Sequence, residues 1–163
     1  MKQVLFLLSA WLWVSLSFAQ SPEWKQFQSP GKASLRGLSP ISDQVCWASG
    51  SGGTWLKTED GGVSWQTGTV AGLDTVDFRS IHAFDSHTAL VASAGQPAVI
   101  YRTEDGGASW QKVHQEGGEA FFDAIQFVDD QKGYVLGDPI GGKWMILETL
   151  DGGRSWHSLA KLP

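Results

Sequence analysis

Thr103-Glu104-Asp105-Gly106-Gly107-Ala108-Ser109-Trp110 decides the fold, because the chain carries this octapeptide three times with small changes. The other copies read TEDGGVSW at 58–65 and TLDGGRSW at 149–156. The aspartates of successive copies, Asp60, Asp105 and Asp151, are 45 and 46 residues apart. A fixed period of this size indicates an array of equivalent supersecondary units.

The octapeptide has the features of a tight corner between two antiparallel strands. Asp-Gly and Gly-Gly between apolar runs favour a hairpin turn, since glycine adopts positive φ without a steric penalty. The aspartate and the flanking hydroxyls can accept hydrogen bonds from N–H groups of their own turn. The closing tryptophans, Trp65, Trp110 and Trp156, each begin the next strand with a large apolar ring. The octapeptides therefore predict structural corners.

Each repeat has room for four short strands separated by polar turns. Four strands in a repeat of about 45 residues are typical of a propeller blade. The sequence therefore predicts an all-β fold with three four-stranded antiparallel blades over residues 34–163. We expect the blades at about 34–68, 78–113 and 121–159, and their first, inner strands at 35–39, 79–84 and 123–128.

Composition excludes several classes of partner and cofactor. The 163 residues carry a formal net charge of −5 and no cluster of Lys or Arg, which argues against nucleic acid as a partner. Cys46 is the single cysteine, so metal and redox motifs built on cysteine pairs are absent. The histidines and acidic residues follow no metal-ligand spacing. We expect no metal and no cofactor.

The N-terminus has the layout of a secretory signal peptide. Lys2 precedes an apolar stretch from Val4 to Phe18, and Ser17 and Ala19 supply small residues before a cleavage point after Ala19. We therefore expect residues 1–19 to be removed and the protein to be secreted or periplasmic. The stretch is short for a spanning helix, so the mature chain is expected not to span a membrane.

The three octapeptides resemble the Asp-box, or bacterial neuraminidase repeat. The Asp-Gly-Gly-x-Ser-Trp form, together with Gly133-Tyr-Val-Leu-Gly137, is most similar to β-propellers of the photosystem II stability/assembly-factor-like family. The resemblance covers about residues 34–159. It implies a propeller of about seven blades, and it is far more specific for fold than for function.

A propeller ring closes with roughly four to eight blades, and this sequence predicts three. In the segment 20–33, residues 23–28 resemble an outer strand of the kind that completes the last blade as a clasp. We therefore expect the chain to be an N-terminal part of a longer or truncated propeller. The alternative is a three-blade unit that forms a ring by self-association.

Candidate ligand-binding residues lie on the face opposite the Asp-boxes, which we call the loop face. Alignment of the inner strands makes Arg36, Arg79 and Asp123 equivalent, at the start of each strand beside the central channel. Asp138 lies in a glycine-rich loop of the same face. These four residues are the predicted ligand-binding set. An alternative for Arg79 and Asp123 is a purely structural ion pair.

The sequence favours a non-catalytic scaffold that binds a protein or a glycan at the loop face, in the manner of an assembly factor. The alternative is a carbohydrate-active enzyme of the glycoside hydrolase or sialidase type, with Asp123 and Asp138 as its carboxylate pair. The arginine cluster and placed tyrosine that the sialidase resemblance implies are not recognisable. We therefore predict no catalytic residues.

Overall fold

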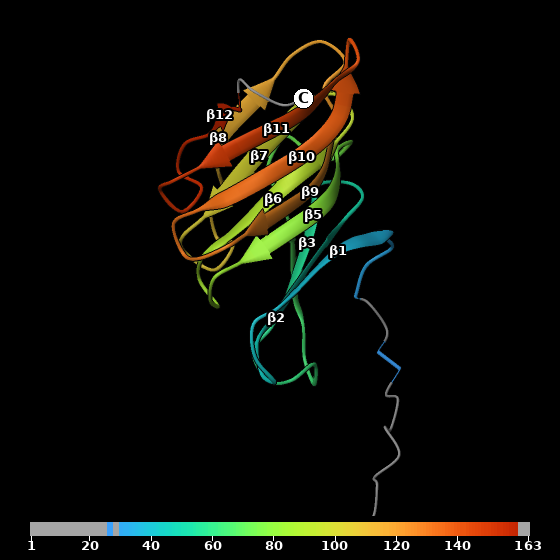
Figure 1. Ribbon diagram of the computed structural model, residues 1–163. Coiled ribbons are helices and arrows are strands. Elements are labelled where there is room, and N and C mark those ends of the chain that lie inside the picture. Colours follow the sequence, from blue (N-terminus) through green and yellow to red (C-terminus); the bar gives the residue numbers. More distant parts are fainter. Residues whose placement is uncertain (1–25, 28–29, 160–163) are drawn as a thin grey trace, which may run out of the picture.

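The computed structural model describes residues 26–27 and 30–159, and within them the chain forms three four-stranded antiparallel sheets (Figure 1). In every sheet the strands pair in chain order, each with its neighbours in the sequence. The prediction of an all-β fold with three four-stranded blades is confirmed.

The strands of the three blades have the following bounds. Blade 1 contains β1 (Leu35–Pro40), β2 (Cys46–Gly50), β3 (Thr54–Thr58) and β4 (Gln66–Thr69). Blade 2 contains β5 (Asp77–Ala83), β6 (Ala89–Ala94), β7 (Ala98–Thr103) and β8 (Gln111–Glu116). Blade 3 contains β9 (Phe122–Phe127), β10 (Gly133–Ile140), β11 (Lys143–Thr149) and β12 (His157–Ser158). The observed inner strands β1, β5 and β9 lie within two residues of the predicted ones.

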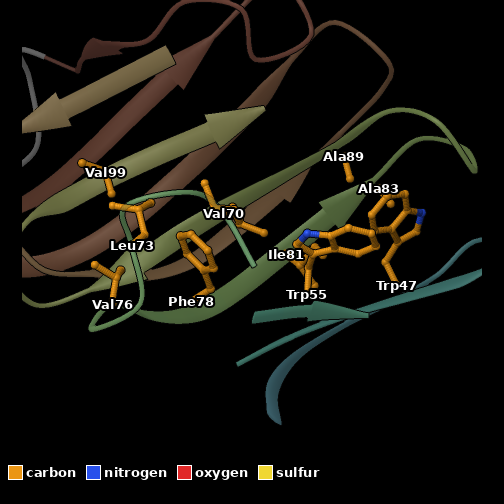
Figure 2. Close-up of a cluster of buried hydrophobic side chains, with 11 residues drawn as sticks. Trp47, Trp55, Val70, Leu73, Val76, Phe78, Ile81, Ala83, Ala89 and Val99 are labelled. Atoms are coloured by element: carbon orange, nitrogen blue, oxygen red, sulfur yellow. The ribbon is translucent and has the colours of Figure 1, made fainter. Parts of the chain in front are cut away.

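Blades 1 and 2 pack face to face through apolar side chains that alternate along their strands. Trp47 and Trp55 of blade 1 are 0% and 7% exposed, and their ring centroids lie 5.6 Å apart. Figure 2 shows both indoles beside Ile81, Ala83 and Ala89 of blade 2. This burial of aromatic area supplies the main driving force for docking the two sheets.

Blade 2 packs on blade 3 through its opposite face. Leu90, Ala92, Ala98 and Ile100 join a second buried cluster with blade 3 residues that include Phe122, Val135 and Leu147. Strand β6 therefore sends alternate residues to different neighbours, because successive side chains of a strand point to opposite faces. Blade 2 is covered on both sides.

Hydrogen bonds from serine side chains fix the spacing of the inner strands. The N–H of Ala83 on β5 donates to Ser39 Oγ of β1 at 3.0 Å, and the N–H of Ile125 on β9 donates to Ser80 Oγ of β5 at 3.0 Å. Each serine satisfies a backbone donor on the unpaired edge of the next blade's inner strand. The inner strands are thus held side by side.

The predicted signal peptide at 1–19 lies outside the described residues, as does most of the predicted clasp strand at 23–28. Of the latter segment, Gln26 and Phe27 are described and neither is in a strand. The Phe27 ring lies 5.2 Å from the Trp65 ring of blade 1. No helix in the described part of the chain is long and apolar enough to cross a membrane.

Candidate functional site

The repeated octapeptides form closed hydrogen-bonded corners between the third and fourth strands. In blade 2, Thr103 Oγ1 donates to Asp105 Oδ1 at 2.8 Å and accepts from the N–H of Gly107 at 3.0 Å. The N–H and the hydroxyl of Ser109 donate to the two oxygens of Asp105 at 2.8 and 2.5 Å. The other two corners have the same bonds, made by Thr58, Asp60 and Ser64 and by Thr149, Asp151 and Ser155.

These bonds favour the ionised form of each corner carboxylate. The hydroxyl and the N–H of Ser109, with Thr103, lower the pKa of Asp105 to about 2. Burial raises the pKa of Asp151, but the bonds from Ser155 and Thr149 outweigh it and bring the value to about 2. The pKa of Asp60 is also lowered, chiefly by Ser64. The corner aspartates are therefore ionised and engaged within their own turns.

Each corner also packs on the turn between the first and second strands of its own blade. The N–H of the first corner glycine donates to a carbonyl of that turn, from Gly106 to His87 at 2.9 Å and from Gly152 to Gln131 at 2.9 Å. Gly61 bonds to Gln44 in the same way at 3.0 Å. These turns and corners share one end of the blades, which we call the corner face; the loop face is the opposite end.

A groove of about 470 Å³ runs along the three inner strands. Its lining includes Arg36 from β1, Arg79 and His82 from β5, and Gln126 from β9. Because β1, β5 and β9 lie side by side, residues far apart in the sequence line one open surface. The structure thus places two of the predicted ligand-binding residues, Arg36 and Arg79, in one groove.

Both groove arginines have carboxylate partners, and both stay half-exposed. Arg36 Nη2 lies 3.8 Å from Asp77 Oδ2, and Arg79 Nε lies 3.5 Å from Asp123 Oδ1. The two arginine side chains are 47% and 46% exposed. The ion pair considered for Arg79 and Asp123 does form, but exposed pairs at such distances contribute little to stability. The guanidinium groups keep donors free for a ligand.

The fourth predicted residue, Asp138, lies next to this cluster and outside the groove lining. Its N–H donates to the Phe121 carbonyl at 3.0 Å, where the pairing of β10 shifts register between Gly137 and Ile140. The Phe121 ring in turn lies 5.5 Å from the Arg79 guanidinium. Asp138 is therefore linked to the arginine site through Phe121, and its own side chain is exposed.

Sequence reasoning missed two contributors to this site, His82 and Gln126. His82 stacks on Phe127 with ring centroids 4.6 Å apart, and burial lowers the pKa of its imidazole. His82 and Gln126 each stand three residues after the aligned Arg79 or Asp123, so the alignment itself contained the signal. Asp77, the carboxylate partner of Arg36, is the first residue of β5.

Metal binding has no support in the described part of the chain. No group of three or more His, Cys, Asp or Glu side chains gathers there closely enough to hold an ion. On the corner face, Glu104 pairs with Arg102 and with Arg154, the latter at 3.1 Å, and the Arg154 pair ties blade 2 to blade 3.

Residues 16–120 match the profile of a family described as photosynthesis system II assembly factor YCF48. No curated protein matches the chain. One similar solved structure is YCF48 bound to a D1 peptide, with 23% identity and a TM-score of 0.66. Another is YCF48 from Cyanidioschyzon merolae, with 22% identity and a TM-score of 0.61.

The matches to the two YCF48 structures each cover 82% of this chain, but only 41% and 42% of the solved YCF48 chains. The chain thus spans less than half the length of the YCF48 chains that it matches. The GH74 enzyme of Niastella koreensis is also similar, with 21% identity and a TM-score of 0.57 over 79% of this chain and 18% of that one. At these identities the similarity establishes the shared fold alone.

Proposed function

The chain belongs to the family of photosynthesis system II assembly factor YCF48, and on that premise we propose that it is a non-catalytic propeller segment that binds a polypeptide of a partner protein. The binding site is the inner-strand groove, at the end that carries Arg36 and Arg79. One observation carries the proposal: two half-exposed arginines from adjacent blades converge on an open groove of about 470 Å³.

The chemistry of the groove favours a ligand with carboxylate groups. A guanidinium can bind a carboxylate through two parallel hydrogen bonds, and the groove arginines lie 3.8 and 3.5 Å from the carboxylates of Asp77 and Asp123. A ligand carboxylate can therefore compete with these partners at little cost. The lowered pKa of His82 leaves a neutral imidazole in the groove near pH 7, able to donate or accept a hydrogen bond.

The similar structure of YCF48 bound to a D1 peptide supports a polypeptide as the class of ligand. That peptide is a property of the solved protein, and the partner of the present chain is a separate question. A glycan is the other ligand class that the sequence left open. Carboxylate-binding arginines favour a peptide with acidic side chains or a free C-terminus over a neutral glycan.

The test is selection of peptides from a random library on the immobilised protein, with a D1 peptide as one defined probe. We expect selected peptides to be rich in Asp, Glu or C-terminal carboxylates, and binding to fall at least about tenfold in Arg79→Ala. Arg154→Ala is the matched control, because Arg154 is 59% exposed on the corner face. Equal loss in both variants, or no peptide selected, would contradict the proposal.

The carbohydrate-active alternative is decided by a hydrolysis screen on glycans. Turnover that Asp123→Asn or Asp138→Asn abolishes would replace the binding proposal with an enzymatic one. We expect no turnover from the unmodified protein.

We also propose that the protein is exported after cleavage behind Ala19. Cell fractionation followed by N-terminal sequencing tests this, and the expected first residue is Gln20. A cytoplasmic protein that keeps its N-terminal stretch would overturn it.

A further inference from the structure

The groove along the inner strands holds a row of polar side chains beyond its two arginines. We call it the second row, and its members stand three places after the aligned charged residues of the inner strands: Ser39, His82 and Gln126. We propose that the second row binds a carboxamide side chain, of Asn or Gln, in the polypeptide whose carboxylate the arginines bind. Such a subsite rests on the proposed function and gives the same groove a second determinant of specificity.

A β-bulge in each inner strand explains why both rows reach the groove. In β5 the pairing with β6 passes from Phe78 directly to Ser80, so Arg79 between them has no partner in the ladder. The same shift leaves Arg36 unpaired in β1 and Asp123 unpaired in β9. Side chains of a regular strand alternate between its faces, so residues three apart would point to opposite sides. The extra residue of the bulge removes this mismatch, and the arginine and the second-row residue of β5 line one groove.

Ser39 and Gln126 have hydrogen-bonding capacity left for a ligand. Ser39 Oγ accepts from the N–H of Ala83 at 3.0 Å, which leaves its hydroxyl proton to be donated. Gln126 Nε2 donates to the Phe127 carbonyl at 3.3 Å, and its amide oxygen accepts from no other described residue. The row thus offers a donor and an acceptor without charge. A carboxamide is complementary to it, because it carries two N–H donors and an accepting oxygen.

His82 is the centre of the second row. Its ring stacks on Phe127 with centroids 4.6 Å apart and meets the Phe84 ring at 4.9 Å, so the ring faces are occupied. Its nitrogens form no hydrogen bond within the described part of the chain, although the side chain is half-buried. Burial lowers the pKa of His82 and outweighs the opposing effect of Asp130. The imidazole is therefore neutral near pH 7, with one nitrogen to donate and one to accept.

Small residues separate the two rows and set the length of the ligand. Gly37, Ser80 and Ala124, one from each inner strand, line the groove between the rows, and none is larger than serine. The backbone of an extended ligand can therefore lie close to the inner strands. Three residues of a strand rise about 10 Å. The carboxamide is accordingly expected about three residues from the carboxylate along the ligand chain.

The test uses synthetic peptides that separate the two interactions. Each peptide is N-acetylated, C-amidated and built on alanine, with one Glu as its only charge. Gln stands three residues before Glu in one peptide and three residues after it in another, and Leu replaces Gln in the matched controls. Isothermal titration calorimetry measures the affinities. We expect one of the two Gln peptides to bind at least about tenfold more tightly than its Leu control.

Three variants locate this preference for Gln over Leu. His82→Phe keeps an aromatic ring against Phe127 and removes both nitrogens, so the preference should fall to within about twofold while Glu stays necessary for binding. Gln126→Leu changes an exposed residue, which spares the core, and should also reduce the preference. His157→Phe is the matched control and should leave the preference unchanged, because His157 is 56% exposed on the outer strand β12.

The imidazole itself gives a direct readout. The ¹⁵N signal that is missing in His82→Phe should shift when the Gln peptide is added and stay in place with the Leu control. A preference that persists in His82→Phe, or Gln and Leu peptides that bind the unmodified protein equally, would overturn the subsite and leave the arginine site standing. An equal loss of both peptides in His82→Phe would show a purely structural histidine and would also overturn it. No binding of any peptide would contradict the groove proposal as well.

Discussion

The corner of blade 3 offers the sharpest test of the structural role of the Asp-boxes, through Thr149→Val. Valine matches threonine in shape, so the change removes the hydroxyl and little else. Thr149 is 0% exposed, and its oxygen accepts from the N–H of Gly153 at 2.9 Å while donating to Asp151 at 2.8 Å. Water cannot replace these bonds at a buried position.

The loss of stability can be worked out from the polar groups that lose their hydrogen-bond partner in Thr149→Val. A buried N–H without an acceptor costs about 1–3 kcal/mol, and the lost bond to the ionised Asp151 adds about 1 kcal/mol. We therefore expect Thr149→Val to lower the free energy of unfolding by about 2–4 kcal/mol. Thr149→Ser is the control, because it keeps the hydroxyl and removes one buried methyl group, at about 1 kcal/mol.

Urea unfolding followed by tryptophan fluorescence measures both variants. The slope of the free energy against urea should stay unchanged, so that the midpoint shift reports stability alone. A valine variant as stable as the serine variant would refute the idea that the corner hydroxyl holds the blade.

Three further results are expected. Stability should fall as the pH drops from about 3.8 towards 2, because the pKa values of Asp105 and Asp151 are about 2 in the folded protein, below the ordinary aspartate value of 3.8. Acid titration of unfolding checks this, and Asp105→Asn should weaken the dependence. Gly107→Ala should destabilise by about 2–4 kcal/mol in thermal unfolding, since its φ is +92° and a Cβ would lie 2.6 Å from the Trp55 ring. Gly72→Ala, with φ +78° and open space around it, should cost only about 1–2 kcal/mol, and equal costs would contradict the close-packing argument.

Much of the fold was predictable because the corners are local. The bonds of the Thr, Asp and Ser side chains in a corner join residues at most four apart, as from Ser109 to Asp105, so the sequence around one turn contains the partners of these side chains. Because the turn signals are local, the predicted bounds of the inner strands lie within two residues of the observed ones. The repeat period and the residue types of the turns were sufficient to predict the three blades.

The packing between blades was not predictable in the same way. Strand β6 is apolar at every position from Ala89 to Ala92, so its pattern does not say which residues face blade 1 and which face blade 3. The candidate site depends on side chains that come together only when blades distant in the sequence pack on one another. Arg36 and Arg79 were found by alignment, but the stacking of His82 on Phe127 joins strands of different blades. That contact exists only after the blades have docked.

The central claim is that a polypeptide binds at the inner-strand groove, away from the acidic corners. The most direct measurement is the affinity of one selected carboxylate-bearing peptide, by fluorescence anisotropy, for Arg79→Ala and for Asp105→Asn. We expect Arg79→Ala to weaken binding at least about tenfold and Asp105→Asn to leave it within about twofold. Binding that survives in Arg79→Ala and is lost in Asp105→Asn would contradict it.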